Sequence, residues 1–345
     1  MLRGPTPPRR APRCNQPSTV PTTRSRHHAV TALTIALLAA CHGAPAPDAR
    51  AGVFAPVDAA PTYHALDGYD PRWQAQVEDG VELARAFWGS YGPVHVWIAG
   101  EEPGQGSPAG ARDAFVHEYC RWRGAGSEHD PADLRRRATE RFLDVVERGD
   151  AEAYLSWVDE FEQPAAELVF LNVHKWWFAR DPIPDPTLRG VHEYTHVFQK
   201  AFAPTPTWMM EGGAVFAEAW VPYVAGRCDQ DVMVQRMLRS AKQAQRATEQ
   251  GFSIADMEDI DRASEGPRGF YRELAYDAGA WAIIALVHRS PSKSVTALRD
   301  AFYPLVDVLG WQRALRRYLG LAHERAFYRE VEALLAAPLP RELKR

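Results

Sequence analysis

The stretch VHEYTHVFQ, residues 191–199, has the pattern HExxH: two histidines four positions apart, with a glutamate directly after the first. On an α-helix, residues at this spacing lie on one face about one turn apart, so His192 and His196 can share a single metal ion. Glu193 lies one step round the helix and is expected to point toward a water bound to that ion. The stretch therefore predicts a helix that carries two ligands and the general base of a catalytic metal site.

The residues around this stretch favour a helix over residues 185–203. Asp185 is a good N-cap, and Pro186 suits the first helical position, where a missing backbone N–H costs little. Apolar residues at helical spacing continue the segment. Both histidines are therefore expected in the middle of the helix.

A catalytic zinc takes three protein ligands and leaves a fourth position for water, so the two histidines need a donor from another element. Glu211 is the candidate, because it is expected to open a helix after the turn PTPT at residues 204–207, which can fold that helix back onto the first. Glu218 lies two turns further along the same face and is expected to orient a ligand histidine. The predicted cofactor is one Zn²⁺ per chain, held by His192, His196 and Glu211.

Two later segments resemble motifs of a known group of zinc peptidases. WMMEGGA, residues 208–214, is similar to the third-ligand motif of the gluzincins, which include the thermolysin-like and aminopeptidase-N-like enzymes. YDAGA, residues 276–280, is similar to the aminopeptidase-N segment whose tyrosine hydrogen-bonds the tetrahedral intermediate. The resemblance assigns that role to Tyr276, with Tyr271 as the alternative. It implies a gluzincin-like catalytic domain that is α/β at first, with a short sheet, and then mostly α.

The resemblance implies a zinc metallopeptidase, a hydrolase that cleaves peptide bonds with a metal-activated water and Glu193 as general base. The stretch Gly-x-Met-Glu-Asn, which grips the substrate's amino terminus in the aminopeptidases, does not occur upstream of His192. We therefore expect an endopeptidase rather than an aminopeptidase, acting on a peptide or protein substrate. Two other hypotheses use the same residues: an envelope lipoprotein that acts as a binding or assembly factor, and a zinc hydrolase of a non-peptide substrate.

The N-terminal segment differs from the rest of the chain. Residues 1–41 hold six arginines and no acidic residue, and the uncharged run AVTALTIALLAA at residues 29–40 precedes Cys41. A basic region followed by a short apolar region is typical of a signal peptide. LAAC, residues 38–41, resembles a bacterial lipobox, which predicts acylation of Cys41, a membrane anchor and a place in the bacterial cell envelope. Ordinary signal cleavage and secretion is the alternative.

Charge and composition argue against a nucleic-acid partner. The segment 1–41 holds six of the 40 basic residues, which leaves 34 basic against 44 acidic residues and a formal charge of −10. Residues 42–61 are rich in alanine, proline and glycine and predict a flexible tether. We expect residues 62–184 to form the α/β half of the catalytic domain and residues 185–345 to form a helical half that carries the zinc site.

Apolar patterning predicts the remaining elements. Continuous apolar runs predict strands at residues 94–99 and 168–173. The second of these lies shortly before the metal helix, where it either binds substrate as an added β-strand or forms part of the core. Helical spacing predicts helices over residues 71–88, 112–122, 132–147, 229–249, 269–288, 294–303, 311–318 and 323–335.

The cysteines follow the predicted compartment. Cys14 lies in the signal peptide and Cys41 in the lipobox, which leaves Cys120 and Cys228. An oxidising envelope favours a disulfide between these two, and two free buried thiols are the alternative.

Two further stretches are interpreted as lying outside the site. HEYCR, residues 117–121, repeats the first three residues of the metal motif, but Arg121 stands where the second histidine would be needed. Trp176 and Trp177 either line the substrate cleft or lie in the core.

Overall fold

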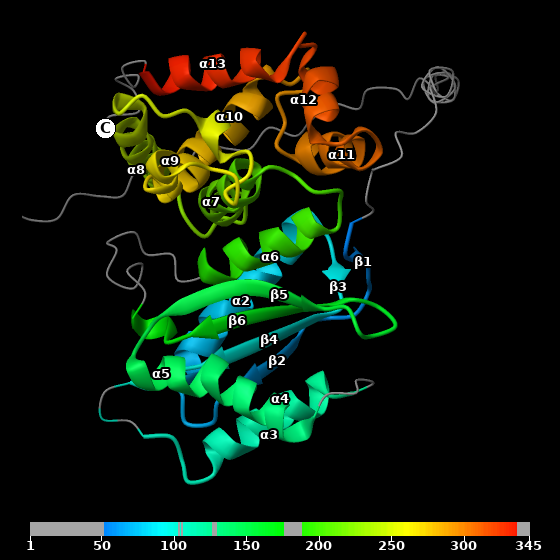
Figure 1. Cartoon of the computed structure of the whole chain (residues 1–345), viewed down its shortest axis with the longest axis vertical. Helices are drawn as coiled ribbons and strands as arrows, with labels where there is room; N and C mark the ends of the chain where they lie inside the picture. The colour runs from blue at the N-terminus through cyan, green and yellow to red at the C-terminus, as the bar shows by residue number, and fades with distance from the viewer. Residues whose placement is uncertain (1–51, 103, 105, 126–129, 176–187, 337–345) are drawn as a thin grey trace, which may run out of the picture. The chain divides into compact units, whose positions relative to one another are not determined.

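The computed structural model describes residues 52–336 except 103, 105, 126–129 and 176–187 (Figure 1). The first half of the chain forms a four-stranded sheet from β2 (Thr62–Ala65), β4 (Val94–Ala99), β6 (Ala165–Leu171) and β5 (Glu152–Val158), in that spatial order. β2, β4 and β6 run parallel, whereas β5 pairs antiparallel with β6. A separate antiparallel pair joins β1 (Ala55–Pro56) to β3 (Tyr91–Gly92).

Each face of the four-stranded sheet carries its own apolar core. On β4, Val96 and Ile98 belong to the core on one face, and Trp97 belongs to the core on the other, as strand alternation requires. The first face packs on α2 (Pro71–Trp88) and α6 (Leu188–Lys200); the second packs on α3 (Ala111–Arg123), α4 (Pro131–Ala138) and α5 (Asp144–Arg148) (Figure 1). The sheet is therefore covered on both faces, as is usual for parallel strands.

α6, the helix that carries the predicted metal ligands, lies tightly against α2. A Cβ on Gly190 would lie 2.3 Å from the backbone nitrogen of Val81, so a larger residue there would push the two helices apart. Asp70 caps α2 by accepting a hydrogen bond from the backbone N–H of Arg72 at 2.9 Å. β5 and β6 also contact α6. These contacts fix the position of α6 relative to the sheet.

The second half of the chain is helical. α7 (Thr207–Val224) packs on α6, and a π-helix, η6 (Arg272–Ala278), packs on α7 together with α10 (Gly279–Arg289). The core beneath α2 and α6 continues into these helices, so the described residues belong to one unit. None of the described helices is long and apolar enough to cross a membrane. The other helices of this half are α8 (Gln230–Glu249), α9 (Glu265–Arg268), η7 (Leu298–Phe302), α11 (Tyr303–Leu309), α12 (Trp311–Leu319) and α13 (Glu324–Ala336).

The predicted class, a small sheet followed by mostly helical structure, is confirmed. The expected strand at 94–99 is β4, and the expected strand at 168–173 overlaps β6. A π-helical turn, η2 (Thr139–Leu143), interrupts the helix predicted over 132–147, and η6 interrupts the one predicted over 269–288. α7 begins four residues before Glu211, so this glutamate lies in the second helical turn and does not open the helix.

Two expectations about the first half are wrong. The segment 42–61, predicted to be a flexible tether, includes residues bound to the folded unit: the Val53 N–H donates to the Lys200 carbonyl at 2.6 Å, Phe54 is buried, and Ala55 pairs with Gly92. The strand at 168–173 is not available to substrate, because β6 lies between β4 and β5. Its alternative, a core strand, is the correct interpretation.

The predicted disulfide is also wrong, because Cys120 and Cys228 are not joined in the structure. Cys120 lies on α3, which packs on one face of the sheet, whereas Cys228 follows α7, which packs with the core of the other face. The alternative of two buried thiols agrees with the structure only in that the two are not bonded to each other, because both side chains are partly exposed. Some sequence predictions lie outside the described residues: the signal peptide with Cys14 and Cys41, the N-cap at Asp185 and Pro186, and the pair Trp176 and Trp177.

Candidate metal centre

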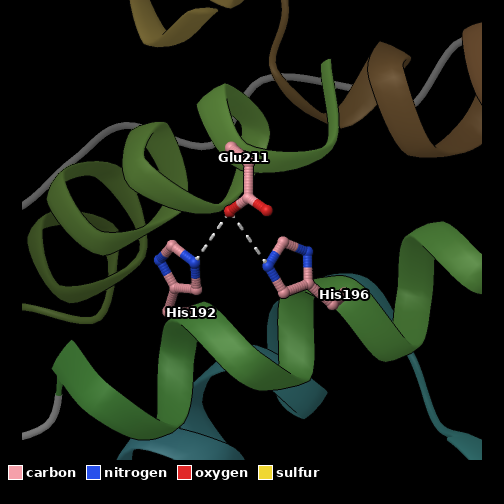
Figure 2. A group of neighbouring side chains, drawn as sticks. All are labelled: His192, His196 and Glu211. Carbon is pink, nitrogen blue, oxygen red and sulfur yellow. Dashed lines mark ion pairs between the residues drawn. The ribbon is translucent and has the colours of Figure 1, made fainter. Parts of the chain in front are cut away.

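Three side chains from two helices meet where α7 crosses α6 (Figure 2). His192 and His196 extend from α6 and Glu211 from α7, and their ligand atoms lie within 4.8 Å of one another. The Oε2 of Glu211 is 3.5 Å from the Nε2 of His192 and 3.6 Å from the Nε2 of His196. Within the described part of the chain, this is the one group of three histidine, cysteine or acidic side chains close enough to share an ion.

The distances around Glu211 suit a shared metal better than hydrogen bonds. Its Oε2 is buried and has no hydrogen-bond partner. Two ligand atoms bound at about 2.0–2.2 Å to a tetrahedral zinc ion lie roughly 3.4 Å apart, whereas an N–H···O hydrogen bond is about 2.9 Å long. His192, His196 and Glu211 are therefore positioned to bind a metal ion.

The other ring nitrogen of each histidine has a partner of its own. The Nδ1 of His192 lies 3.0 Å from the Oε1 of Glu218, and the Nδ1 of His196 lies 2.8 Å from the Oε1 of Gln199. A partner at Nδ1 fixes the tautomer and leaves Nε2 available to a metal. Glu218 thus lies where the sequence placed a partner for a ligand histidine.

Gln199 is a residue of the centre that sequence reasoning missed. Besides facing His196, its amide Nε2 donates to the backbone carbonyls of Met209 and Met210, each at 3.0 Å. One side chain therefore links the second histidine to the turn of α7 that precedes Glu211. The signal that could have found it is its position three residues after His196, on the same face of the helix.

Both candidate tyrosines lie beside the centre, on η6 and at the residue before it. The hydroxyl of Tyr271 donates to the Oε1 of Glu211 at 3.2 Å. The ring of Tyr276 stacks on His192 with centroids 5.9 Å apart, and it meets Tyr271 edge-on at 5.5 Å. Burial and the nearby Glu211 charge raise the pKa of Tyr276 well above its usual value, so its hydroxyl stays protonated and can donate. π-Helical turns are frequent at functional sites.

Without a metal, the centre carries strongly shifted pKa values. Burial alone would lower the pKa of His192, but the carboxylates of Glu218 and Glu211 outweigh burial and raise it well above the usual value. Burial would raise the pKa of Glu211, but the two histidines hold it far below its ordinary value. Glu193 is 6% exposed, and burial raises its pKa against the opposing effect of the histidines. A carboxyl group shifted in this direction suits proton transfer near neutral pH.

Glu118, from the sequence pair His117-Glu118, contacts a histidine of the sheet and not the metal centre. The Oε1 of Glu118 lies 2.8 Å from the Nδ1 of His64, and the Nε2 of His64 lies 3.1 Å from the Nδ1 of His95. Glu118 comes from α3, which packs on the opposite face of the sheet from α6. The interpretation of residues 117–121 as lying outside the metal site agrees with this placement.

Comparisons of the chain with protein-family models, with curated proteins and with solved structures found no match. A functional assignment therefore depends on the chemistry of the residues around the metal centre, and membership of the gluzincins stays a prediction.

Proposed function

We propose that this chain is a zinc-dependent metallopeptidase. The observation that carries the proposal is the convergence of His192, His196 and Glu211 within 4.8 Å, with Glu193 between the two histidines in sequence. Two imidazole nitrogens and one carboxylate are a donor set of catalytic zinc sites, which keep one position open for water. We therefore propose one Zn²⁺ per chain, held by these three side chains.

The chemistry supplied by zinc at such a centre is polarisation of a carbonyl and a lowered pKa of the attacking water. Glu193 accepts the proton of that water as it attacks the scissile carbonyl, and then donates the proton to the leaving amine. Its buried position, directly after the ligand candidate His192 in sequence, supports this role. Because Glu193 is not among the three ligands, its loss should stop turnover and spare metal binding.

Tyr276 is proposed to donate a hydrogen bond to the carbonyl oxygen as negative charge develops there. Its protonated hydroxyl and its ring contact with His192 support this role. Donors of this kind typically contribute about two to three orders of magnitude in rate. Tyr271, whose hydroxyl is bonded to Glu211, would instead orient that ligand.

A peptide substrate is supported by one edge of the sheet, where no other strand of the described residues pairs with β5. β5 is an edge strand and contacts α6, and an extended peptide can pair with such an edge through backbone hydrogen bonds. Trp157 on β5 is 40% exposed, and its ring lies 5.3 Å from the Nζ of Lys200 at the end of α6. A peptide paired along this edge can extend in both directions from the scissile bond. This arrangement favours an endopeptidase over an aminopeptidase.

The N-terminal sequence supports a location in the bacterial cell envelope. The basic and apolar segment before Cys41 favours export, and the lipobox-like LAAC favours a lipid anchor at that cysteine. The proposed enzyme would contact the membrane through this anchor.

Two other functions are compatible with the same centre. An envelope lipoprotein could keep the metal site while acting as a binding or assembly factor, and a zinc hydrolase could act on a non-peptide substrate. The buried Glu193 beside the three ligands favours a hydrolytic enzyme over the binding protein, since a binding role needs no general base.

The test is hydrolysis of a mixed peptide library by the full chain, with wild type beside Glu193→Gln. We expect zinc in both proteins and cleavage by wild type only. The matched control is Glu118→Gln, the same substitution in the second His-Glu pair, which should cleave like wild type. Zinc in both proteins with no cleavage in either would favour the two other functions. Equal cleavage by Glu193→Gln and wild type would remove Glu193 from the mechanism.

A further inference from the structure

Arg189 lies on α6 one turn before His192. The spacings of three residues to His192 and seven to His196 place all three on one face of the helix. The arginine side chain is only 4% exposed. A buried cation therefore lies next to the proposed metal centre on the same helix.

The guanidinium of Arg189 has few hydrogen-bond partners. Its Nη1 donates to the Oε1 of Gln76 at 3.3 Å, whereas its Nε and Nη2 are buried without a hydrogen-bond partner. Among the described residues, the charges that act on this guanidinium are those of Tyr69 and Glu218, and neither side chain accepts a hydrogen bond from its Nε or Nη2. Burial lowers its pKa to about 10, so the group still carries its charge at neutral pH. Burying a charge without a close partner is costly, so a substrate group that paired with it would gain binding energy.

His174 supplies a second polar group without a partner. Its Nε2 is buried and makes no hydrogen bond, while its Nδ1 lies 3.2 Å from the hydroxyl of Tyr69. The His174 ring and the Arg189 guanidinium both lie against the indole of Trp73, with centroid distances of 6.3 Å and 6.0 Å. Two side chains with three unpartnered nitrogen atoms thus lie against one aromatic side chain.

These side chains gather where the parallel strands end. Tyr69 follows β2, Glu102 follows β4 and His174 follows β6, each within a few residues of the strand's carboxyl end. Open α/β sheets bind their ligands at this edge. Glu102 accepts a hydrogen bond from the indole Nε1 of Trp73, so that carboxylate is already engaged.

We infer that Arg189 binds a carboxylate of the substrate, with the Nε2 of His174 beside it. Two unpartnered guanidinium N–H groups suit a carboxylate, whose two oxygens accept from such a fork. This inference names the substrate class of the proposed peptidase and rests on that function for its substrate. At about 1.5 Å per helical residue, Arg189 lies roughly 4.5 Å along α6 from His192 and 10 Å from His196. An extended peptide covers this distance with about two or three residues, so the acidic group belongs close to the scissile bond.

The first arm of the test measures specificity with the full chain. Matched peptides differ only in glutamate or glutamine at each position within three residues of the cleaved bond, or in a free or amidated C-terminus. Wild type should prefer the charged form at one position by about 10- to 100-fold in kcat/KM, and Arg189→Met should reduce this ratio to about 1. Arg227→Met, which removes an exposed arginine paired with Asp79 at 3.1 Å, should keep the ratio. Equal rates on both forms in wild type would overturn the inference and leave the peptidase proposal intact.

The second arm needs no turnover. Glutarate is titrated into the zinc-loaded full chain by calorimetry, and its Kd should rise at least about 10-fold in Arg189→Met. Equal Kd values in the two proteins would overturn the inference. Arg189-dependent binding in a chain that cleaves no peptide would support the anion site and reject the peptidase.

Melting temperature separates binding from a structural role. Methionine keeps much of the volume of Arg189 and removes an unpaired buried charge, so Arg189→Met should melt at or above the wild-type temperature. A lower melting temperature together with an unchanged preference for the charged peptide would mean that Arg189 supports the fold, which overturns the inference.

Discussion

A Cβ on Gly212 would lie 2.1 Å from the carbonyl carbon of Gly279, so α7 and α10 meet backbone to backbone. Gly212 directly follows the proposed ligand Glu211, and Gly279 directly follows the π-helix that carries Tyr276. The contact of two glycines therefore brings the third ligand and the candidate oxyanion donor to the same side of α6. A side chain at either glycine would force one helix to move.

We predict that Gly212→Ala destabilises the protein by about 3 kcal/mol and weakens zinc binding, because α7 must shift to admit the methyl group. Gly213→Ala is the matched comparison. Its Cβ would lie 2.4 Å from the Nε2 of Gln199, a side-chain atom rather than backbone, so stability should fall less while His196 loses its partner. Denaturant unfolding and zinc titration measure both effects. Wild-type stability and zinc affinity in Gly212→Ala would contradict the close backbone contact between α7 and α10 at this glycine.

The partners at the two Nδ1 atoms should set metal affinity. Glu218→Gln and Gln199→Leu are each expected to raise the Kd for zinc by about 10- to 100-fold, because each loosens the orientation of one ligand histidine. Competition with a chelator of known affinity gives the Kd values. Glu273→Gln, on the π-helix η6, is the control and should bind zinc like wild type. Unchanged Kd values in both test variants would contradict the orienting role.

Substitution of Tyr276 should mainly lower kcat, whereas substitution of Tyr271 should mainly weaken zinc binding. Tyr276→Phe is expected to lower kcat by about 100- to 1000-fold with a smaller loss of zinc affinity than in Tyr271→Phe, because a donor to the developing oxyanion is lost. Tyr271→Phe should instead weaken zinc binding, since its hydroxyl bonds the ligand Glu211 at 3.2 Å. Steady-state kinetics and zinc titration of both variants make the comparison. The reverse pattern would exchange the two roles.

Asp277 should make the fold less stable as the pH rises. Its carboxyl is buried and accepts from the Ser240 hydroxyl at 2.6 Å, and burial raises its pKa from 3.8 to about 6. Between these values the unfolded chain binds fewer protons than the folded one, so the free energy of unfolding falls with rising pH, by about 3 kcal/mol in total. Asp277→Asn should remove this loss and be more stable at pH 7. Unfolding curves from pH 4 to 7 that stay parallel in the two proteins would contradict the prediction.

The metal centre could be predicted largely from sequence because its geometry is local. The spacing of His192 and His196 puts both on one face of any helix, whatever surrounds it. Glu211 could be proposed from the turn at residues 204–207, which can fold its helix back onto the first, and the resemblance to the gluzincins supported it. Tyr276 needed that resemblance, because nothing in its spacing says which helices will touch. Gln199 and Arg189 were missed for a related reason: each matters through contacts with residues on other elements, Met209 in the first case and Trp73 in the second.

The wrong predictions about the fold concern contacts between segments that are distant in the chain, which a single sequence does not reveal. β6 was recognised as an apolar strand, but its place between β4 and β5 depends on β5, whose Glu152 and exposed Trp157 weaken the apolar signal. The disulfide failed because the redox compartment favours bonds between cysteines in general and says nothing of the distance from α3 to the end of α7. The segment at Val53 and Ala55 has the composition of a tether, yet it pairs with residues that lie far along the chain.

The zinc content of the purified full chain, with wild type beside His196→Ala and Glu193→Gln, tests the metal centre directly. We predict one zinc per chain in wild type and in Glu193→Gln, and almost none in His196→Ala, because two remaining ligands cannot complete the site. Wild type without zinc, or His196→Ala with as much zinc as wild type, would contradict the assignment of His192, His196 and Glu211 as the metal centre.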